Sequence, residues 1–455
     1  MMSPRDESSK AAASPLLPVL LVVIIGALAF FPQGLFTPGG FFASALIVVL
    51  ALVFLLRPPA RSSIPLGLEF SLFVLLCLVS AWRSPYFWRG WEKFCWIFHG
   101  FLLFFITWSL VEGGRKLRWL LGALAGVAVA VALYSLAREW MIPSRQLAQM
   151  VLKDTSVSPE MREDLLYALS TGRLRGPFGN PNHLAGFLAA ASAPLLLLIL
   201  RGPGGARHWL GILAALPVLW AVWSTQSRSG FLTLILVVII LTIGSFSHLR
   251  KNIFHWKLSP LKVIAIVIAL VVLAFLFGES WVVISRVSTI KTRLVYYRVA
   301  MELIRQAPLF GHGLESFALL YPQYHQLGQG EAQYVHNWPL EVLLEMGIAG
   351  LAVFGWWIFS IFRLFNERLN AAQDAAEERI LLVLMSGVSA ILLQSLFDFN
   401  TDLPVIFAML GFFLGALSGT AAARQQQADA RPPWWSAPAF RTGAGLLLAS
   451  HLIFS

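Results

Sequence analysis

Hydrophobic residues along this chain gather in long continuous runs that polar or charged segments separate. A helix needs about 20 apolar residues to span a bilayer, whereas a membrane β-strand alternates apolar and polar positions. The continuous runs therefore predict helices. About twelve runs are long enough, at residues 16–31, 41–56, 64–81, 94–110, 119–137, 183–200, 209–224, 229–246, 261–278, 338–362, 380–397 and 403–420. The predicted fold class is all-α, a polytopic membrane helix bundle of about 12 transmembrane helices.

Basic residues fall in every second predicted loop, on the side of the N-terminus. They are Arg57 and Arg61, then Arg115, Lys116 and Arg118, then Arg201 and Arg207, then Arg250, Lys251, Lys257 and Lys262, then Arg363, Arg368 and Arg379, and finally Arg424, Arg431 and Arg441 in the tail. Short loops rich in Lys and Arg stay in the cytoplasm. Both termini are therefore predicted to be cytoplasmic, and the first apolar run is predicted to be a retained anchor.

Composition agrees with this class. Hydrophobic residues make up 58% of the chain and charged residues only 13%, against about 25% charged in soluble domains. The net charge of +11 is explained by basic residues that fix the membrane topology or contact anionic lipids. No nucleic-acid partner is predicted. Cys77 and Cys95 lie in apolar segments and predict neither a disulfide nor a zinc site.

Two predicted extracytoplasmic loops, 138–182 and 279–337, are too long to be simple connectors. Helical spacing of apolar residues predicts a helix over 293–307 and a shorter one over 314–325. These elements are expected to form a helical periplasmic loop subdomain over the bundle. Residues 1–420 are thus predicted to be one membrane-embedded domain. Residues 421–455 are predicted to be a cytoplasmic tail followed by an apolar segment too short to span.

Several basic residues on the predicted outer side are not explained by the topology rule, among them Arg83, Lys93, Arg173, Arg175, Arg228, Arg293 and Arg298. The planar guanidinium binds two phosphate oxygens at once, so such a cluster favours an anionic ligand at headgroup depth. The alternative is that each side chain simply reaches lipid headgroups.

Two motifs lie at the outer ends of predicted spans. The first is Gly172-Arg-Leu-Arg175-Gly-Pro-Phe-Gly-Asn180-Pro-Asn182-His183. We expect Asn182 to cap a helix whose N-terminus favours phosphate. The second is Trp223-Ser-Thr-Gln-Ser-Arg228-Ser-Gly230, where a charge at the end of a span is a functional candidate. A capped loop and an ordinary polar turn are the structural alternatives.

The third motif, Tyr334-Val-His336-Asn337-Trp-Pro-Leu-Glu341-Val-Leu-Leu-Glu345-Met-Gly347, closes the second long loop. Histidine titrates near neutral pH and can take a proton from an attacking hydroxyl, so His336 is the predicted base. Its alternative role is to anchor the helix at the interface. Asp398 and Asp402 are predicted on the same face, where they could orient a base, hold a sugar hydroxyl or form a polar turn.

In this order and topology, the motifs resemble the O-antigen ligase and polymerase superfamily (Wzy_C-like). The resemblance rests on Gly179 to Asn182, Ser227 to Gly230, Arg293 with Pro308-Leu-Phe-Gly-His-Gly313, and His336-Asn337 with Glu345 and Gly347. It covers about residues 60–420 and is most specific over 172–350.

The resemblance implies an inner-membrane transferase that uses undecaprenyl diphosphate-linked glycan at the periplasmic face. By motif, Arg228 and Arg293 would hold the diphosphate, assisted by Arg298, Arg175 and Arg83. His336 would be the catalytic base, and the supporting residues would be Asn180, Asn182, Asn337 and Glu345. No cofactor is implied. The large loops contain no paired carboxylates of the kind that would predict a metal site.

The acceptor stays open. The leading hypothesis is ligation to lipid A–core. Glycan polymerisation and protein O-oligosaccharyl transfer are alternatives that use the same chemistry with a different acceptor. A lipid-linked sugar transporter or flippase would explain the spans and the arginines, but it explains the structured loops poorly. A non-catalytic envelope scaffold would make the arrangement of Arg and His incidental.

Overall fold

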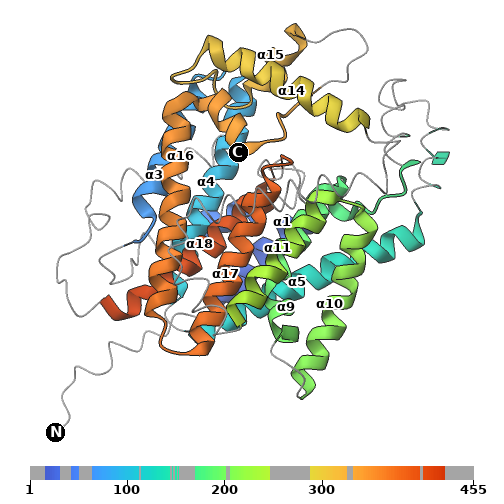
Figure 1. Cartoon of the computed structure of the whole chain (residues 1–455), viewed down its shortest axis with the longest axis vertical. Helices are drawn as coiled ribbons and strands as arrows, with labels where there is room; N and C mark the ends of the chain where they lie inside the picture. Colours follow the sequence, from blue (N-terminus) through green and yellow to red (C-terminus); the bar gives the residue numbers. More distant parts are fainter. Residues whose placement is uncertain are drawn as a thin grey trace.

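The computed structural model describes residues 16–30, 43–50, 64–111, 114–143, 170–200, 205–245, 287–324, 332–399 and 403–425, with single positions between 144 and 169. This part of the chain is helical and contains no strand, which confirms the all-α class (Figure 1). Its α-helices are α1 (Leu16–Phe30), α3 (Gly67–Trp82), α4 (Phe87–Leu110), α5 (Gly114–Met141), α8 (Pro181–Ala191), α9 (Ala193–Leu200), α10 (Ala206–Thr225), α11 (Arg228–Ser245), α14 (Val287–Gln306), α15 (Ser316–Leu320), α16 (Trp338–Ala371), α17 (Ala375–Gln394) and α18 (Pro404–Gln425). Two 3-10 helices, η2 (Gly176–Phe178) and η4 (Tyr321–Gln323), are also described, and residues 43–50 are helical.

Four described helices are long and apolar enough to cross a membrane. They span Phe87–Leu110, Lys116–Met141, His208–Thr225 and Trp338–Ala371. Shorter apolar helices cover Val19–Phe30, Gly67–Trp82, Arg228–Thr242 and Pro404–Thr420. The predicted number of about 12 spans is therefore not confirmed. The predicted span 261–278 lies outside the described residues, and the single helix predicted over 183–200 is two helices, α8 and α9.

Helices α4 and α18 form the closest helix pair, and glycine is the reason. Gly411, Gly415 and Gly419 recur every fourth residue along α18, so they line one face of it. A Cβ at Gly411 would collide with the carbonyl oxygen of Gly100, and one at Gly415 with that of Phe104. Small residues at this spacing allow two helices in a membrane to approach closely. In the most apolar part of each helix, 83% of the residues are buried in α4 but only 33% in α10. Helix α4 is therefore central and α10 peripheral.

Helix α16 is broken near its start, at Gly347, which has φ 67° and ψ −165°. The break frees backbone groups that the loop before α15 then satisfies. His312 N donates to Leu344 O at 2.9 Å, and Ile348 N donates to Pro308 O at 2.8 Å. A Cβ at position 347 would collide with the carbonyl of Leu309, so glycine is required for space as well as for its positive φ. Irregular backbone at membrane depth is tolerated only where protein buries it in this way.

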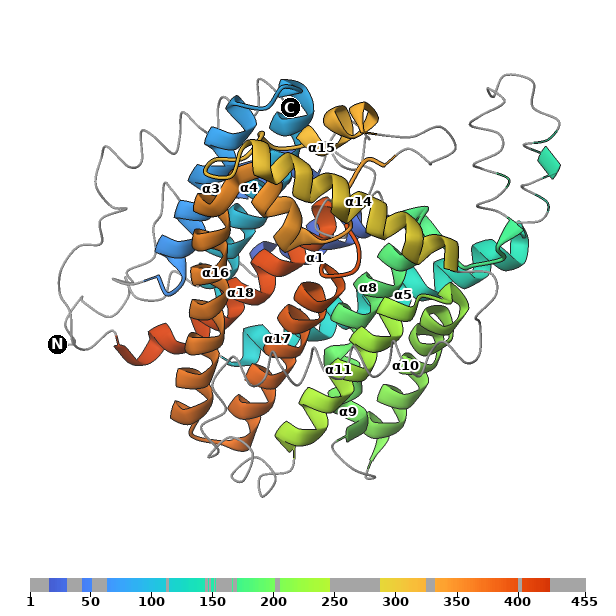
Figure 2. The same cartoon turned by 45° about the horizontal axis from the view of Figure 1, so that its top comes forward.

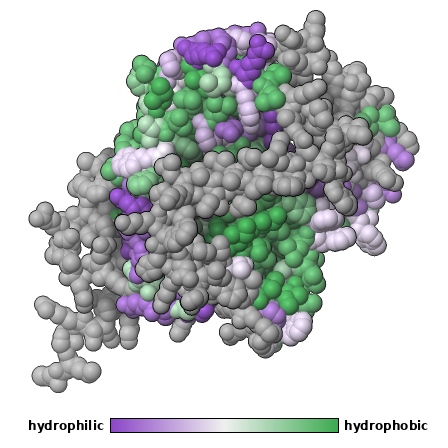
Figure 3. All heavy atoms as spheres, viewed as in Figure 1, coloured by the Kyte–Doolittle hydropathy of each residue, from purple (hydrophilic) through white to green (hydrophobic). Residues whose placement is uncertain are grey.

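Helix α14 confirms the helix predicted over 293–307, and it crosses one end of the bundle (Figures 1 and 2). It packs against α16 through a small apolar cluster that includes Tyr296, Leu303 and Leu344. The shorter helix predicted over 314–325 is divided between α15 and η4. Hydrophilic residues gather at the end of the molecule where α14 and α15 lie, as Figure 3 shows, while hydrophobic residues cover much of the surface below. This polar end is where the candidate site forms.

Candidate functional site

The backbone around His336 is fixed by the start of α16. Asn337 is the N-cap of this helix, and its Oδ1 accepts from Leu340 N at 3.0 Å. Its Nδ2 donates to Leu396 O at 3.1 Å, which ties the cap to the end of α17. His336 has φ 61°, a left-handed conformation that a non-glycine residue adopts at a cost of about 1–3 kcal/mol. Strain of this kind persists only where the surroundings impose it, and it is common at functional sites.

The imidazole of His336 is paired with the carboxylate of Asp398. Nδ1 lies 3.0 Å from Asp398 Oδ1, which also accepts from Phe399 N at 3.0 Å. Asp398 is fully buried, and burial alone would raise the pKa of its carboxyl group. The hydrogen bond from His336 and the charges of the nearby His183, His336 and Arg293 outweigh burial, and the pKa is well below its usual range. Asp398 is therefore a carboxylate acceptor for the histidine.

Two aromatic rings hold the imidazole from its other sides. Tyr296 of α14 stacks on it at 5.8 Å between centroids and 14° between planes, and Phe399 meets it edge-on at 4.8 Å. The His336 side chain keeps 22% of its surface exposed. Among the described residues, none forms a hydrogen bond with its Nε2. The ring is therefore oriented through Nδ1 and leaves Nε2 available to a ligand.

A series of hydrogen bonds runs from Asp398 to the first and second motifs. Asn182 Nδ2 donates to Asp398 Oδ2 at 2.6 Å, and Asn182 Oδ1 accepts from Arg173 Nη2 at 2.8 Å. Arg173 Nε in turn donates to Thr225 O, also at 2.8 Å, at the end of α10. The Arg228 turn follows Thr225 directly. The three motifs of the sequence thus meet at one place in the structure.

Gln394 at the end of α17 provides a second link. Its Nε2 donates to Ser229 Oγ at 2.9 Å and to Asn182 O at 3.3 Å, while its Oε1 accepts from Thr233 Oγ1 at 3.0 Å. Gln394 is buried, so its amide is fully used in holding α8, α11 and α17 together.

Asn180, not Asn182, caps α8. The Asn180 side chain accepts from Asn182 N at 2.9 Å, and Pro181 follows at the first helical position. The expectation that Asn182 is the cap is wrong because the helix begins two residues earlier, at Pro181. That shift leaves the Asn182 side chain free for Arg173 and Asp398.

Two of the predicted diphosphate ligands lie beside this network. Arg228 is exposed at the first position of α11, where Ser227 Oγ accepts from Gly230 N at 3.2 Å. Arg293 of α14 is half-buried, and its charge contributes to the low pKa of the Asp398 carboxyl. Helix N-termini and arginines both favour anions, so this side of His336 is positive.

The other predicted residues lie elsewhere. Arg83 donates to Phe310 O at 3.2 Å, and its guanidinium is 5.9 Å from the Phe310 ring. Arg175 bonds to Gly179 O and Thr171 Oγ1 within its own loop, and Arg298 is exposed on α14. Glu345 belongs to a separate buried cluster.

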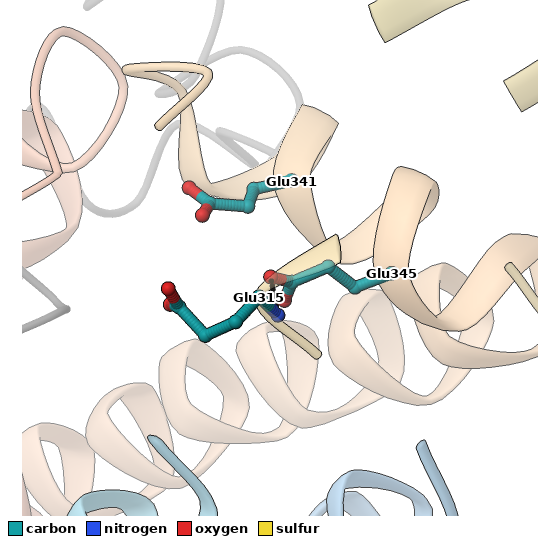
Figure 4. A group of neighbouring side chains, drawn as sticks. All are labelled: Glu315, Glu341 and Glu345. Carbon is teal, nitrogen blue, oxygen red and sulfur yellow. Dashed lines mark hydrogen bonds between the residues drawn. The ribbon is translucent and has the colours of Figure 1, made fainter. Parts of the chain in front are cut away.

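That cluster surrounds one lysine. Lys93 Nζ lies 3.0 Å from Glu341 Oε1, 3.1 Å from Glu345 Oε1 and 3.2 Å from Glu315 Oε1, and all four side chains are buried. Figure 4 shows two of the glutamates on α16 and the third reaching toward them from the turn before α15. The three carboxylates have the spacing of a possible metal site. In the structure the lysine ammonium supplies the cation.

Sequence reasoning does not identify the contacts of three of these residues, Arg173, Lys93 and Gln394. It groups Arg173 and Lys93 with the outer basic residues that suit an anion, whereas Arg173 bonds to Thr225 and Asn182, and Lys93 is buried among three glutamates. Asp398 is one of the two carboxylates predicted to orient a base, and in the structure it pairs with His336. Lys93 was placed outside the predicted span 94–110, although α4 begins at Phe87. A charge inside an apolar helix together with two glutamates four residues apart was the signal for a buried ion pair. For Gln394 the sequence gave no signal.

The fold and the site define a protein of apolar helices with a histidine–carboxylate pair close to the arginines of α11 and α14. Residues 212–355 match the O-antigen ligase family, Wzy_C. This match confirms the resemblance seen in the motifs. A comparison with curated proteins found no match. The domain supports glycan transfer of the O-antigen ligase and polymerase type, and with the apolar helices it supports a bacterial inner-membrane location.

Proposed function

We propose that this chain transfers a glycan from undecaprenyl diphosphate to a hydroxyl group of lipid A–core at the periplasmic face. The observation that carries the proposal is His336, whose Nδ1 pairs with a buried carboxylate while its side chain stays 22% exposed and no described residue bonds to its Nε2. A neutral imidazole held in this way is suited to take a proton from a hydroxyl. The domain match supports glycan transfer as the general chemistry.

The acceptor oxygen attacks the anomeric carbon of the glycan as Nε2 of His336 removes its proton. The bond from that carbon to the diphosphate oxygen breaks, and undecaprenyl diphosphate leaves with the electron pair. In-line attack inverts the anomeric configuration, which NMR of the product checks. Asp398 stabilises the imidazolium that forms.

The leaving diphosphate gains negative charge, which needs a cationic partner. Arg228 and Arg293 lie on the positive side of His336 and are assigned this role, with Arg83, Arg175 and Arg298 as further contacts along the lipid headgroup. In this assignment the membrane domain covers residues 1–420, both termini are cytoplasmic, and the site faces the periplasm. The reaction is proposed to be metal-independent because arginines replace the divalent cation.

The test is an in vitro transfer assay with purified protein, undecaprenyl diphosphate-linked glycan and lipid A–core, with EDTA present. Wild type is compared with His336→Ala and Arg228→Ala, and with Arg305→Gln as a surface control. We expect transfer by wild type and the control and loss in the other two. Parallel reactions with a second lipid-linked glycan or a peptide as acceptor distinguish ligation from polymerisation and protein glycosylation. Absence of transfer to every acceptor by folded wild type refutes the enzyme assignment and leaves flipping or scaffolding.

A further inference from the structure

The side chains between α10 and His336 form one uninterrupted series of donors and acceptors. Thr225 O accepts from Arg173 Nε, and Arg173 Nη2 donates to Asn182 Oδ1. Asn182 Nδ2 donates to Asp398 Oδ2, and Asp398 Oδ1 pairs with Nδ1 of His336. The three bonds that connect Thr225 to Asp398 through Arg173 and Asn182 are 2.6–2.8 Å long, which is short for N–H···O hydrogen bonds.

The chemistry of the groups gives this series a direction. A guanidinium can only donate hydrogen bonds, and an ionised carboxylate can only accept them. An amide side chain accepts at one end and donates at the other, so Asn182 can join the two. Since Arg173 requires the oxygen of Asn182, the NH₂ group of Asn182 faces Asp398. An amide turned the other way would place its oxygen against the carboxylate.

The same logic continues into the histidine. Asp398 accepts at both oxygens, so the ring nitrogen beside it must carry the hydrogen. Nδ1 of His336 is then protonated, and the lone pair of the neutral ring is on Nε2, the atom that faces away from Asp398. The tautomer that a base requires is thereby determined by Asp398, and through Asn182 by Arg173, although Arg173 does not contact the imidazole.

Arg173 is itself held by the end of a helix. The last carbonyls of α10 have no partner within the helix and form its negative pole. Thr225 O accepts from Arg173 Nε, and Ser224 O accepts from Leu174 N at 2.9 Å. The segment that carries Arg173 is therefore fixed to the residues that lead into the Arg228 turn.

We infer that Arg173 and Asn182 are positioning residues that orient Asp398 and thereby hold His336 with Nε2 as the base atom. The inference rests on the proposed function for its effect on transfer. Its structural part, the state of the His336 ring, holds whether or not the acceptor is correctly assigned. Neither residue contacts the reacting atoms in this scheme.

Substitutions separate this role from simple helix capping. Arg173→Gln keeps a donor for the α10 carbonyls, but its amide can also accept and no longer selects one orientation of Asn182. Asn182→Asp presents an acceptor to Asp398, and Arg173→Lys keeps a donor-only cation. Arg305→Gln, on exposed α14 surface where Arg305 pairs with Glu302, is the matched control.

Two readouts are needed. The first is transfer kinetics. Arg173→Gln and Asn182→Asp should lower kcat about 10–100-fold, the usual effect of residues that orient a functional group, without changing KM for the donor. Arg173→Lys should recover part of the loss, and Arg305→Gln should match wild type.

The second readout needs no substrate. Diethyl pyrocarbonate modifies neutral imidazole. The rate at which it modifies His336, measured by mass spectrometry at a series of pH values, therefore reports the protonation of that ring. The charged and titratable groups near the ring are Asp398, His183, Arg293 and Tyr296. Asn182→Asp adds a negative charge and Arg173→Gln removes a positive one, and both favour imidazolium. The acid limb of the modification profile should move to higher pH in both variants and stay in place in the control.

Each outcome decides something. A kcat loss with a shifted modification profile in folded protein supports the inference. A loss with an unchanged profile and a lower melting temperature means that Arg173 only caps α10, and it overturns the inference, as does an unchanged kcat. A shifted profile in a chain whose wild type transfers nothing keeps the positioning role and refutes the proposed function.

Discussion

Two groups of charged residues lie at the start of α16, and they differ in whether all their polar atoms are paired. His336 stands just before the helix with its Nδ1 bonded, its Nε2 available and 22% of its side chain exposed. Glu341 and Glu345 lie within the helix, buried around Lys93. In the first site, Nε2 of His336 has no hydrogen-bond partner among the described residues, whereas in the second the ammonium of Lys93 contacts all three carboxylates.

The backbone repeats this contrast. His336 adopts a strained left-handed conformation, and its ring is held by residues from α8, α14 and the turn between α17 and α18. The lysine cluster joins α4, α16 and the turn before α15, beside the break at Gly347. A strained, partly open group with an unused atom is suited to chemistry, whereas buried, mutually paired charges are suited to holding elements in register. If this distinction is right, the two regions should respond to mutation in opposite ways.

The largest expected effect is on transfer in Asp398→Asn. Where a histidine base depends on an aspartate, the change to asparagine costs about 10⁴-fold in kcat because the ring takes the wrong tautomer. We expect a loss of about 10²–10⁴-fold here, with the melting temperature close to that of wild type. The measurement is steady-state transfer beside thermal unfolding in the same detergent. Full activity in Asp398→Asn would show that the pairing is only structural.

Lys93→Met should behave in the reverse way. Removing one partner of a buried ion pair leaves uncompensated charge and costs about 3–5 kcal/mol. We expect a large fall in melting temperature and in yield of folded protein, with residual activity in whatever fraction folds. Arg305→Met removes an exposed pair worth about 0–1 kcal/mol and is the control. Wild-type stability in Lys93→Met would mean that the carboxylates hold another cation or extra protons.

A smaller effect is expected at the break between the two regions. Gly347→Ala introduces a Cβ against the Leu309 carbonyl at a positive φ, which should cost about 1–3 kcal/mol. Gly355→Ala, later in the same helix, meets nothing within 4 Å and should be neutral or slightly stabilising. Thermal unfolding of the two variants compares them directly. Equal melting temperatures would show that the loop at 308–313 does not depend on the break.

Local pattern was enough to predict much of the fold. The helical spacing over 293–307 is confirmed by α14, the continuous apolar runs by α4, α5, α10 and α16, and the ordered motifs by the family match. These features depend on residues close together in the sequence. The number of spans rests on segments partly outside the described residues, so it stays a prediction.

The site itself was predictable only in part. His336, Asn182 and Asn337 stood out because their motifs are polar and lie at span ends. The pairing of His336 with Asp398 joins residues 62 positions apart, and the sequence narrowed the candidate carboxylates to Asp398 and Asp402 without choosing between them. Lys93 was missed because a helix boundary was placed seven residues late, which put a buried charge into a loop. The spacing of the glycines at 411, 415 and 419 indicates close helix packing, but within the apolar run 403–420 it was not used as a prediction.

The smallest expected effect concerns pH and stability. Burial would raise the pKa of Asp398, but the His336 hydrogen bond and nearby positive charges lower it overall in the folded chain. A carboxyl group with a depressed folded-state pKa stabilises the fold above the unfolded pKa, and this contribution is lost as pH falls through the folded value. The melting temperature of wild type should therefore fall more steeply than that of Asp398→Asn at pH below about 4, the usual aspartate pKa. At pH 7 the wild type should keep its full contribution. Parallel curves down to strongly acidic pH would show that burial offsets the His336 interaction, and that Asp398 orients the ring without stabilising the fold.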